Sequence, residues 1–355
     1  MNYTIHNGNN IDILKTYPDN SFDSIVTDPP YGIEFLGKDW DSNTGAVETW
    51  AECFRVLKPG GYLLAFSAAR TYHNLATNIE GVGFEIRDQL MWLYASGFPK
   101  AQDVGKAIQR RQGVEEYEGY VGTTKNAGFG QTDHARVRAG AEWSTKETRV
   151  GKAKCTSPEA KQWAGWKTAL KPAHEPIVMA RKPFKGSCID NVLTHGLGAL
   201  NIDATRLNDK FPNNVIGEVE GYQKFFFCPK VSRKERHIGH ETPPAMFGHM
   251  QGAYDEKGQR YAVELDKRTE DVGNNHPTVK PVELMKYLIK LVTPPNSTVL
   301  DPFNGSGSTG MAAVELGHTY IGCELDPTYV DIAKRRIEAW NTPEEPTLNT
   351  DFFKE

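Results

Sequence analysis

Residues 297–317 read STVLDPFNGSGSTGMAAVELG, which predicts a strand, a glycine-rich loop and a helix. The loop has the GxGxxG spacing at Gly305, Gly307 and Gly310, and glycines there allow a tight turn and close approach of a ligand to the backbone. The next apolar run, TYIGCEL, contains Glu324, about 20 residues further on, where an acid can bind ribose hydroxyls. This order of elements predicts a site for a nucleoside-containing cofactor.

The surroundings of the loop favour one cofactor over another. A fold that binds a dinucleotide needs a second βαβ half, but the sequence shows only one clear helix after Glu324. Asp301 places a carboxylate at the end of the strand before the glycines, which suits a cationic or amine-bearing ligand better than a pyrophosphate. S-adenosylmethionine carries an amino group, a sulfonium and a ribose, so we expect it rather than NAD.

Residues 1–100 also alternate strand-like and helix-like runs. SFDSIVTD, YLLAFSA and FEIRDQLMWLY predict strands, while TWAECFRVL and TYHNLATNIEGVG predict helices that end at Pro/Gly breaks. Such alternation predicts a largely parallel sheet with helices on its faces. Because the C-terminal half is too short to complete a sheet, we expect these strands to complete it and to bring TDPPYG, residues 27–32, beside the glycine loop.

Asp28, Pro29, Pro30 and Tyr31 form a rigid corner at the end of one predicted strand. The two prolines restrict the backbone and remove two of its donors. An exocyclic amine on a nucleobase is a weak nucleophile because its lone pair is delocalised into the ring. The Asp28 carboxylate and the Pro29 carbonyl can accept its N–H bonds and stabilise the positive charge that develops on nitrogen. Tyr31 offers a ring face for stacking on a base that has been flipped out of a duplex.

The composition is that of an ordinary soluble protein, with 39% hydrophobic and 24% charged residues. We expect neither a signal peptide nor a membrane-spanning segment. The five cysteines form no CxxC pair, which predicts no metal site and fits a reducing cytoplasm.

The formal net charge is −4, but residues 100–185 contain 17 Lys/Arg against 9 Asp/Glu. This excess indicates either a basic face for nucleic acid or an ordinary solvated surface.

Together these motifs resemble those of the amino-methylating DNA methyltransferases, which modify N6 of adenine or N4 of cytosine. DPPY resembles their catalytic motif, DPFNGSG their cofactor motif, and HPTVKP, residues 276–281, a third motif that contacts the methionine moiety. The catalytic motif comes first and the glycine loop last, an order that resembles the β class. Segments such as RVLKPGGYLLAF and ALKPAHEPIVMARKP resemble phage and prophage methylases. The resemblance covers most of residues 1–110 and 165–340.

The resemblance implies a Rossmann-like α/β methyltransferase fold that depends on S-adenosylmethionine. Its sheet is expected to be mostly parallel, seven-stranded and circularly permuted, with an inserted target-recognition region. The implied segments are 1–110, the catalytic half; 111–170, a variable basic insertion; 171–185, a returning strand of the catalytic half; 186–270, the target-recognition region; 271–345, the cofactor-binding half; and 346–355, a tail.

The resemblance also implies the site residues. Catalysis is assigned to Asp28, Pro29, Pro30 and Tyr31. Cofactor binding is assigned to Asn9, Thr278, Lys280, Asp301, Pro302, Phe303, Asn304, Gly305, Ser306, Gly307, Glu324 and Leu325. Relatives carry Gly-Asp where this chain has Gly8-Asn9, so the role of this position is open: Asn9 can still accept a hydrogen bond through its amide oxygen, and Asp12 is the alternative.

Three further groups have two interpretations each. Arg233, Lys234 and Arg236 are predicted to contact DNA phosphates, with a solvated helix face as the competing interpretation. His174 and Glu175 either shape the base pocket or begin a strand. Trp163 and Trp166 either stack on bases or pack in the protein.

The predicted function is therefore methylation of a specific site in double-stranded DNA by base flipping. The Asp at the start of DPPY favours N6 of adenine, because relatives that methylate N4 of cytosine more often carry Ser there. N4-cytosine methylation is the alternative. Methylation of RNA or of a protein amide, and a DNA-binding module without catalysis, are weaker candidates. The expected partners, besides duplex DNA, are a second copy of the chain and a cognate restriction endonuclease.

Overall fold

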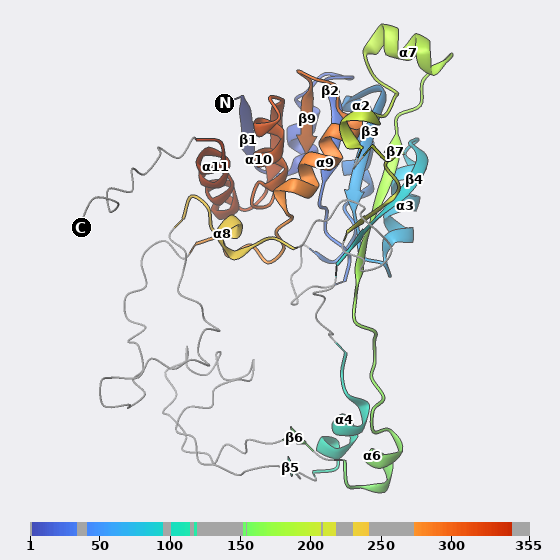
Figure 1. Cartoon of the computed structure of the whole chain (residues 1–355), viewed down its shortest axis with the longest axis vertical. Helices are drawn as coiled ribbons and strands as arrows, with labels where there is room; N and C mark the ends of the chain where they lie inside the picture. Colours follow the sequence, from blue (N-terminus) through green and yellow to red (C-terminus); the bar gives the residue numbers. More distant parts are fainter. Residues whose placement is uncertain are drawn as a thin grey trace, which may run out of the picture. The chain divides into compact units, whose positions relative to one another are not determined.

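The computed structural model describes residues 2–33, 41–94, 101–113, 117–118, 152–153, 155–206, 209–217, 230–240 and 273–342. The chain divides into two compact units. The first consists of Met1–Ser96 and Ala173–Glu355, and the second of Gly97–Pro172 (Figure 1). The predicted insertion, residues 111–170, lies inside the second unit, which begins earlier than the sequence suggests.

The first unit is built on one sheet, to which the described residues contribute eight strands. Their order across the sheet is β1 (Tyr3–Asn7), β10 (Thr319–Glu324), β9 (Thr298–Asp301), β2 (Phe22–Thr27), β3 (Leu57–Phe66), β7 (His174–Arg181), β4 (Glu85–Leu93) and β8 (Val215–Gly217). Only β7 runs antiparallel to its neighbours among these strands. The predicted Rossmann-like, mostly parallel fold is confirmed. The strand beyond the expected seven is β8, a three-residue edge strand too short to show a period in the sequence.

The C-terminal strands enter the middle of the sheet. β9 and β10 lie between β1 and β2, and β9 pairs in parallel with β2 through Ser24–Val299 and Ile25–Leu300. The carboxyl ends of neighbouring parallel strands lie at the same edge of a sheet, which is where ligands bind in such folds. The pairing therefore brings DPPY, which follows β2, beside the glycine loop, which follows β9, as the circularly permuted order predicts.

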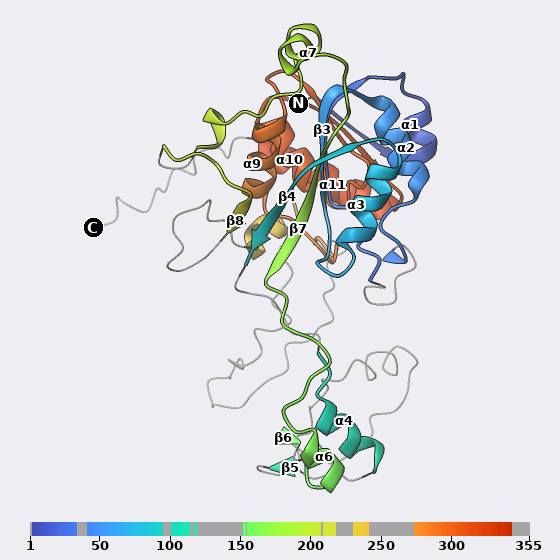
Figure 2. The same cartoon turned by 90° about the vertical axis from the view of Figure 1, so that its right-hand side faces the viewer.

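Helices cover both faces of the sheet, and the strands alternate their side chains between them. Leu63 and Ala65 of β3 pack with α1 (Asn10–Lys15), α2 (Val47–Val56) and α3 (Tyr72–Gly81). Leu64 and Phe66 belong to the core on the other face, with α9 (Val282–Val292), α10 (Ser308–Glu315) and α11 (Pro327–Asn341). Figure 2 shows α9 and α10 on one side of β3 and β7, and α1, α2 and α3 on the other.

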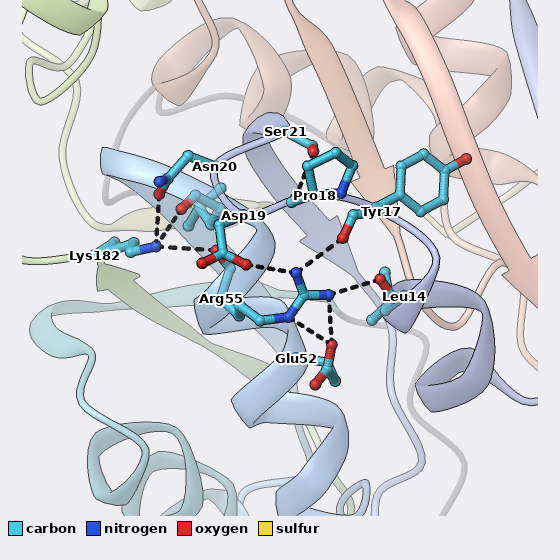
Figure 3. A network of polar contacts seen from close by, with 10 residues as sticks. Leu14, Tyr17, Pro18, Asp19, Asn20, Ser21, Glu52, Arg55 and Lys182 are labelled. Carbon is cyan, nitrogen blue, oxygen red and sulfur yellow. Dashed lines mark hydrogen bonds and ion pairs between the residues drawn. The ribbon is translucent and has the colours of Figure 1, made fainter.

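A polar network holds the edge of the sheet where β2 begins (Figure 3). Arg55 of α2 donates to the carbonyls of Leu14 and Tyr17 and pairs with Asp19, at distances of 2.8–2.9 Å. Lys182, just after β7, donates to the Leu57 carbonyl at 2.6 Å. These contacts tie α1, α2 and β3 together at the end of β2 opposite DPPY.

The predicted start of β3 differs in the structure. α2 ends at Val56 as expected, but β3 begins at Leu57 and includes the KPGG segment that was predicted to be a break. Gly60 makes this possible, because it has a positive φ of 80° and its N–H donates to the Lys182 carbonyl at 3.0 Å. The apolar run KFFFCPK, residues 224–230, predicts a further short strand, and it lies outside the described residues except for Lys230.

The remaining elements are short. In the first unit they are α7 (Cys188–His195), the 3-10 helix η3 (Asp203–Thr205) and α8 (Arg233–Arg236). The second unit contains α4 (Val104–Arg111), β5 (Tyr117–Glu118), β6 (Lys152–Ala153) and α6 (Pro158–Gln162). Gln109 joins α4 to the start of α6, because its amide donates to the Thr156 hydroxyl at 2.7 Å and accepts from the Thr156 N–H at 3.0 Å. Across the described ranges, no helix has both the length and the apolar character needed to span a membrane.

Candidate active site at the carboxyl ends of β2 and β9

Asp41 fixes the corner that follows β2. Its Oδ1 accepts the N–H bonds of Tyr31 and Gly32 at 2.6 and 3.1 Å, and its Oδ2 accepts the N–H of Ile33 at 3.3 Å. Pro29 and Pro30 have no N–H to offer. The backbone donors of the corner are thus turned toward the buried Asp41, and acceptors remain for a ligand. Asp41 is the last residue of GKDWD, residues 37–41, a segment that resembles phage and prophage methylases, but the resemblance alone gives this residue no role.

Four polar side chains meet at this corner. The Tyr31 hydroxyl lies 2.9 Å from Asp28 Oδ1 and 2.9 Å from Glu175 Oε2. Lys280 Nζ lies 2.5 Å from Asp28 Oδ2 and 3.5 Å from Glu175 Oε2. These residues come from the loop after β2, the start of β7 and the loop before α9. Of the two interpretations of Glu175, its place in this cluster favours a role in the base pocket.

The protonation of the cluster follows from its burial and its charges. Burial lowers the pKa of Lys280, but the charges of Asp28 and Glu175 outweigh that effect and the net result is a raised pKa. Burial and the same two carboxylates raise the pKa of Tyr31 well above its usual value. The ammonium and the phenol therefore both keep their protons at neutral pH. Counted as formal charges, two carboxylates and one ammonium give the cluster −1, which suits a reaction that develops positive charge.

Asp301 lies at the end of β9 and is buried among hydroxyl donors. It accepts hydrogen bonds from Thr27 Oγ1 at 2.7 Å, Thr309 Oγ1 at 2.6 Å and the Phe303 N–H at 3.0 Å. Burial raises its pKa to about 6 despite these donors. Its described partners all belong to the chain, so it joins β9 to β2 and α10; a direct contact with a cofactor remains a prediction.

The glycine loop requires two of its glycines. Gly305 has a φ of 52°, and a Cβ atom there would lie 2.9 Å from Nε2 of His276. Gly307 has a φ of 81°, and a Cβ atom there would lie 2.9 Å from the Cβ of Ala333. Burial lowers the pKa of His276 to about 4, so its ring is neutral and Nδ1 can donate to the Thr278 carbonyl at 2.5 Å. The His276 ring therefore packs against Gly305 of the loop, while its Nδ1 is held by the Thr278 carbonyl.

Two further polar residues set the shape of this loop. Asn304 is buried and accepts a hydrogen bond from the Tyr320 hydroxyl at 2.8 Å. The buried Arg336 of α11 donates to the carbonyl and the hydroxyl of Ser306 at 2.5 and 3.1 Å. The sequence analysis missed Arg336, because it stands in a charged helix, KRRIEAW, where a solvated arginine is the ordinary expectation.

Glu324 lies at the end of β10 and faces the glycine loop. Its Oε2 accepts the Gly305 N–H at 2.8 Å and its Oε1 accepts the Asp326 N–H at 3.0 Å. Burial raises its pKa to about 7. The next residue, Leu325, is 68% exposed. Glu324 and Leu325 thus place a carboxylate and an apolar side chain together at the carboxyl edge of the sheet.

Asn9 and Pro302 lie at the same edge. β1 pairs with β10 up to Asn7–Glu324, and the Gly8 N–H donates to the Glu324 carbonyl at 2.9 Å. Asn9 is exposed and caps α1, because its side-chain oxygen accepts the Ile11 N–H at 2.9 Å. The Pro302 carbonyl accepts a hydrogen bond from the Asn10 amide at 3.1 Å. Most residues assigned to the cofactor are therefore gathered at one edge, while Lys280 contacts the Asp28 carboxylate instead.

The residues predicted to bind DNA separate into two kinds. Arg233 and Lys234 of α8 are exposed. Arg236 is half-buried, its guanidinium donates to the His276 carbonyl at 2.7 Å, and burial lowers its pKa. Arg236 therefore supports the HPTVKP segment from inside the protein. In the second unit, Trp163 and Trp166 are 39% and 59% exposed, and their rings contact each other at 5.2 Å between centroids.

The sequence matches a known protein family and several characterised relatives. Residues 22–335 match the N6_N4_Mtase family, described as DNA methylase. The chain is 26% identical over 379 residues to the type II methyltransferase M.HindIII of Haemophilus influenzae, with 94% of each protein covered. It is 23% identical over 351 residues to the DNA adenine methyltransferase YhdJ of Escherichia coli, covering 94% of this chain and 82% of that protein.

A solved structure is similar over the same length. The crystal structure of the M1.HpyAVI-SAM complex is 18% identical and has a TM-score of 0.46, with 94% of this chain and 99% of that chain covered. The family match spans most of the sequence and includes DPPY, HPTVKP and the glycine loop. This chain therefore belongs to the family of DNA methylases that act on N6 of adenine or N4 of cytosine.

Proposed function

We propose that this methylase transfers a methyl group from S-adenosylmethionine to the N6 amine of adenine, in a specific site of double-stranded DNA, after flipping the base out of the helix. The observation that carries this proposal is the Asp28 carboxylate at a corner whose backbone donors are turned toward Asp41. The pairing of β2 with β9 supports it, because it brings this acceptor beside the glycine loop.

The chain's residues act on the amine that attacks. The Asp28 carboxylate and the Pro29 carbonyl accept its N–H bonds, which favours a tetrahedral nitrogen with a localised lone pair. The nitrogen then forms a bond to the methyl carbon, the carbon–sulfur bond breaks, and its electron pair goes to sulfur. The amine loses one proton to solvent through the acidic cluster. Asp28, Glu175 and Lys280 together carry a net negative charge. This charge stabilises the positive nitrogen before that proton leaves.

S-adenosylmethionine is the methyl donor and, when bound, supplies an electrophilic methyl group on a sulfonium centre. The described residues fit it. Glu324 offers a carboxylate to the ribose hydroxyls, and the exposed Leu325 offers an apolar surface to the adenine. Ser308 Oγ, at the first residue of α10, is buried and has no hydrogen-bond partner among the described residues, which leaves a polar group at the loop for a ligand. Thr278 and the loop Asn304–Gly307 are proposed to bind the methionine end.

The choice of adenine rests on the Asp at the start of DPPY and on the description of YhdJ as an adenine methyltransferase. Adenine and cytosine both present an exocyclic amine beside an unprotonated ring nitrogen, so the Asp28 corner can accept either. Methylation of N4 of cytosine is therefore the alternative. A second copy of the chain, a cognate restriction endonuclease and a cytoplasmic location remain proposals.

Mass spectrometry of nucleosides tests the proposal. The protein is incubated with S-adenosylmethionine and long unmethylated duplex DNA, which is then digested. We expect N6-methyladenine. N4-methylcytosine would mean that the amine is methylated as proposed but that the target base is cytosine. Neither product, from protein whose melting temperature still rises with S-adenosylmethionine, would overturn DNA methylation as the activity of this chain.

A further inference from the structure

Lys280 occupies the Asp28 carboxylate, which in the proposed function accepts a hydrogen bond from the target amine. Its Nζ lies 2.5 Å from Asp28 Oδ2, and its side chain is only 6% exposed. An ammonium on a carboxylate adds the attraction between two full charges to the hydrogen bond, and a neutral N–H donor cannot supply that attraction. A nucleobase amine therefore cannot take this oxygen while the ammonium holds it, unless the ammonium has another partner within reach.

Glu175 is that partner. Its Oε2 lies 3.5 Å from Lys280 Nζ, and its side chain is 16% exposed. The rings of Phe66 and Tyr31, with centroids 4.9 and 5.5 Å from Nζ, flank the ammonium and can stabilise it by cation–π attraction. Lys280 can thus turn from Asp28 to Glu175 without entering water.

The Tyr31 hydroxyl makes the exchange complete. It has one proton but lies 2.9 Å from both carboxylates, so it can donate to only one of them at a time. While Lys280 is on Asp28, the phenol donates to Glu175. Once Lys280 is on Glu175, the phenol donates to Asp28 Oδ1, and Oδ2 becomes free. Each carboxylate keeps at least one internal donor in both arrangements, because Glu175 also has the Tyr94 hydroxyl as a hydrogen-bond partner, so neither buried charge is left unpaired.

We propose that Glu175 is a positioning residue that receives Lys280 when the target base enters, so that the Asp28 carboxylate passes from the lysine to the base amine. This inference rests on the proposed function and deepens it. It explains why a buried lysine lies at a site whose other groups accept hydrogen bonds. Lys280 then acts as the internal occupant of the base site until DNA delivers the amine.

The test compares Glu175→Gln, Lys280→Met and the double variant in the nucleoside assay. Glu283→Gln is the matched control, because Glu283 is an exposed carboxylate that pairs with Lys286. In Glu175→Gln the ammonium has only Asp28 as a charged partner. We expect kcat/KM for DNA to fall on the order of 10- to 100-fold, the factor that one charge-assisted hydrogen bond provides. The affinity for S-adenosylmethionine should stay within about twofold of the wild type, since Glu175 binds no cofactor in this scheme.

The double variant gives the decisive result. Removal of the ammonium from Glu175→Gln frees Asp28 again, so the double variant should be more active than Glu175→Gln alone. Equal activity of Glu175→Gln and Glu283→Gln would overturn the inference, and so would losses that simply multiply in the double variant. If Glu175→Gln fails to fold, Glu175→Asp with and without Lys280→Met gives a milder form of the comparison, because the shorter side chain draws the carboxylate away from Lys280 Nζ. Failure of the wild type itself to methylate DNA would instead overturn the proposed function.

Discussion

The Thr27 hydroxyl donates a hydrogen bond to the Asp301 carboxylate at 2.7 Å, and this bond joins the last residue of β2 to the last residue of β9. Both residues are buried. The bond thus connects the strand that carries DPPY with the strand that carries the glycine loop, at the edge where both motifs begin. The bond therefore helps to hold the Asp28 corner and the glycine loop at a fixed spacing.

Thr27→Val keeps the shape of the side chain and removes this donor. Asp301 then keeps two of its three described donors, and we expect the free energy of unfolding to fall by about 1.5–3 kcal/mol, the usual value for a hydrogen bond to a charged group. Thermal unfolding measures the loss, with Thr4→Val on an exposed position of β1 as the control. Equal melting temperatures for the two variants would contradict this role of Thr27.

Glu324 gives a prediction about pH. Burial raises its pKa to about 7 from a usual value of 4.5. A group whose pKa is raised on folding stabilises the fold fully below its unfolded pKa, and this contribution is lost as the pH rises through the folded value. Glu324→Gln cannot titrate, so its melting temperature relative to the wild type should rise between pH 4.5 and pH 8.

Asp301 titrates in part of the same range, because burial raises its pKa to about 6. It is present in both proteins, so its own burial is common to them, and only its charge interaction with Glu324, which also raises the Glu324 pKa, enters the difference. A constant difference in melting temperature from pH 4.5 to pH 8 would show that Glu324 does not titrate as its burial implies.

The fold and the two motifs could be predicted because their signals are local. The glycines of residues 305–310 and the β-branched run before DPPY each fix a short stretch of backbone. Parallel pairing then decides which ends of the strands meet. The resemblance to the family supplied the roles of these motifs. The contact between Lys280 and Asp28 could not be predicted in this way. The two residues are 252 positions apart, and the sequence around each of them gives no sign of the other.

The contacts of Glu175 and Arg336 also could not be predicted from local sequence patterns. Glu175 begins a strand, where a polar residue is ordinary, and its contact with Tyr31 spans 144 positions. Arg336 stands in a helix rich in charged residues, and only the packing of α11 against the loop reveals that it is buried. The sequence indicates that a charged side chain of a helix is buried only when its neighbours on the same face of the helix are apolar.

Arg336 predicts a further effect on cofactor binding. Its guanidinium donates to two oxygen atoms of Ser306 and is fully buried. Lysine keeps the charge but cannot reproduce the planar fork of donors. Arg336→Lys should therefore lower the melting temperature by a few degrees and weaken binding of S-adenosylmethionine, measured by calorimetry. Lys334→Arg makes the reverse exchange at an exposed position of the same helix and should leave both values unchanged. Equal cofactor affinity in the two variants would mean that Arg336 does not shape the loop.

Asp28→Ala separates chemistry from folding. Lys280 keeps Glu175 as a charged partner at 3.5 Å, and the Tyr31 hydroxyl keeps its contact with Glu175 at 2.9 Å, so the protein should fold and bind S-adenosylmethionine. The target amine loses its carboxylate acceptor, and we expect turnover to fall by at least about 100-fold, the order seen when one charge-stabilising group is removed from an active site. Methylated nucleosides measure turnover, and the rise in melting temperature with cofactor confirms binding. Wild-type turnover in Asp28→Ala would show that the amine is activated by another group, and the Pro29 carbonyl would then be the remaining acceptor at this corner.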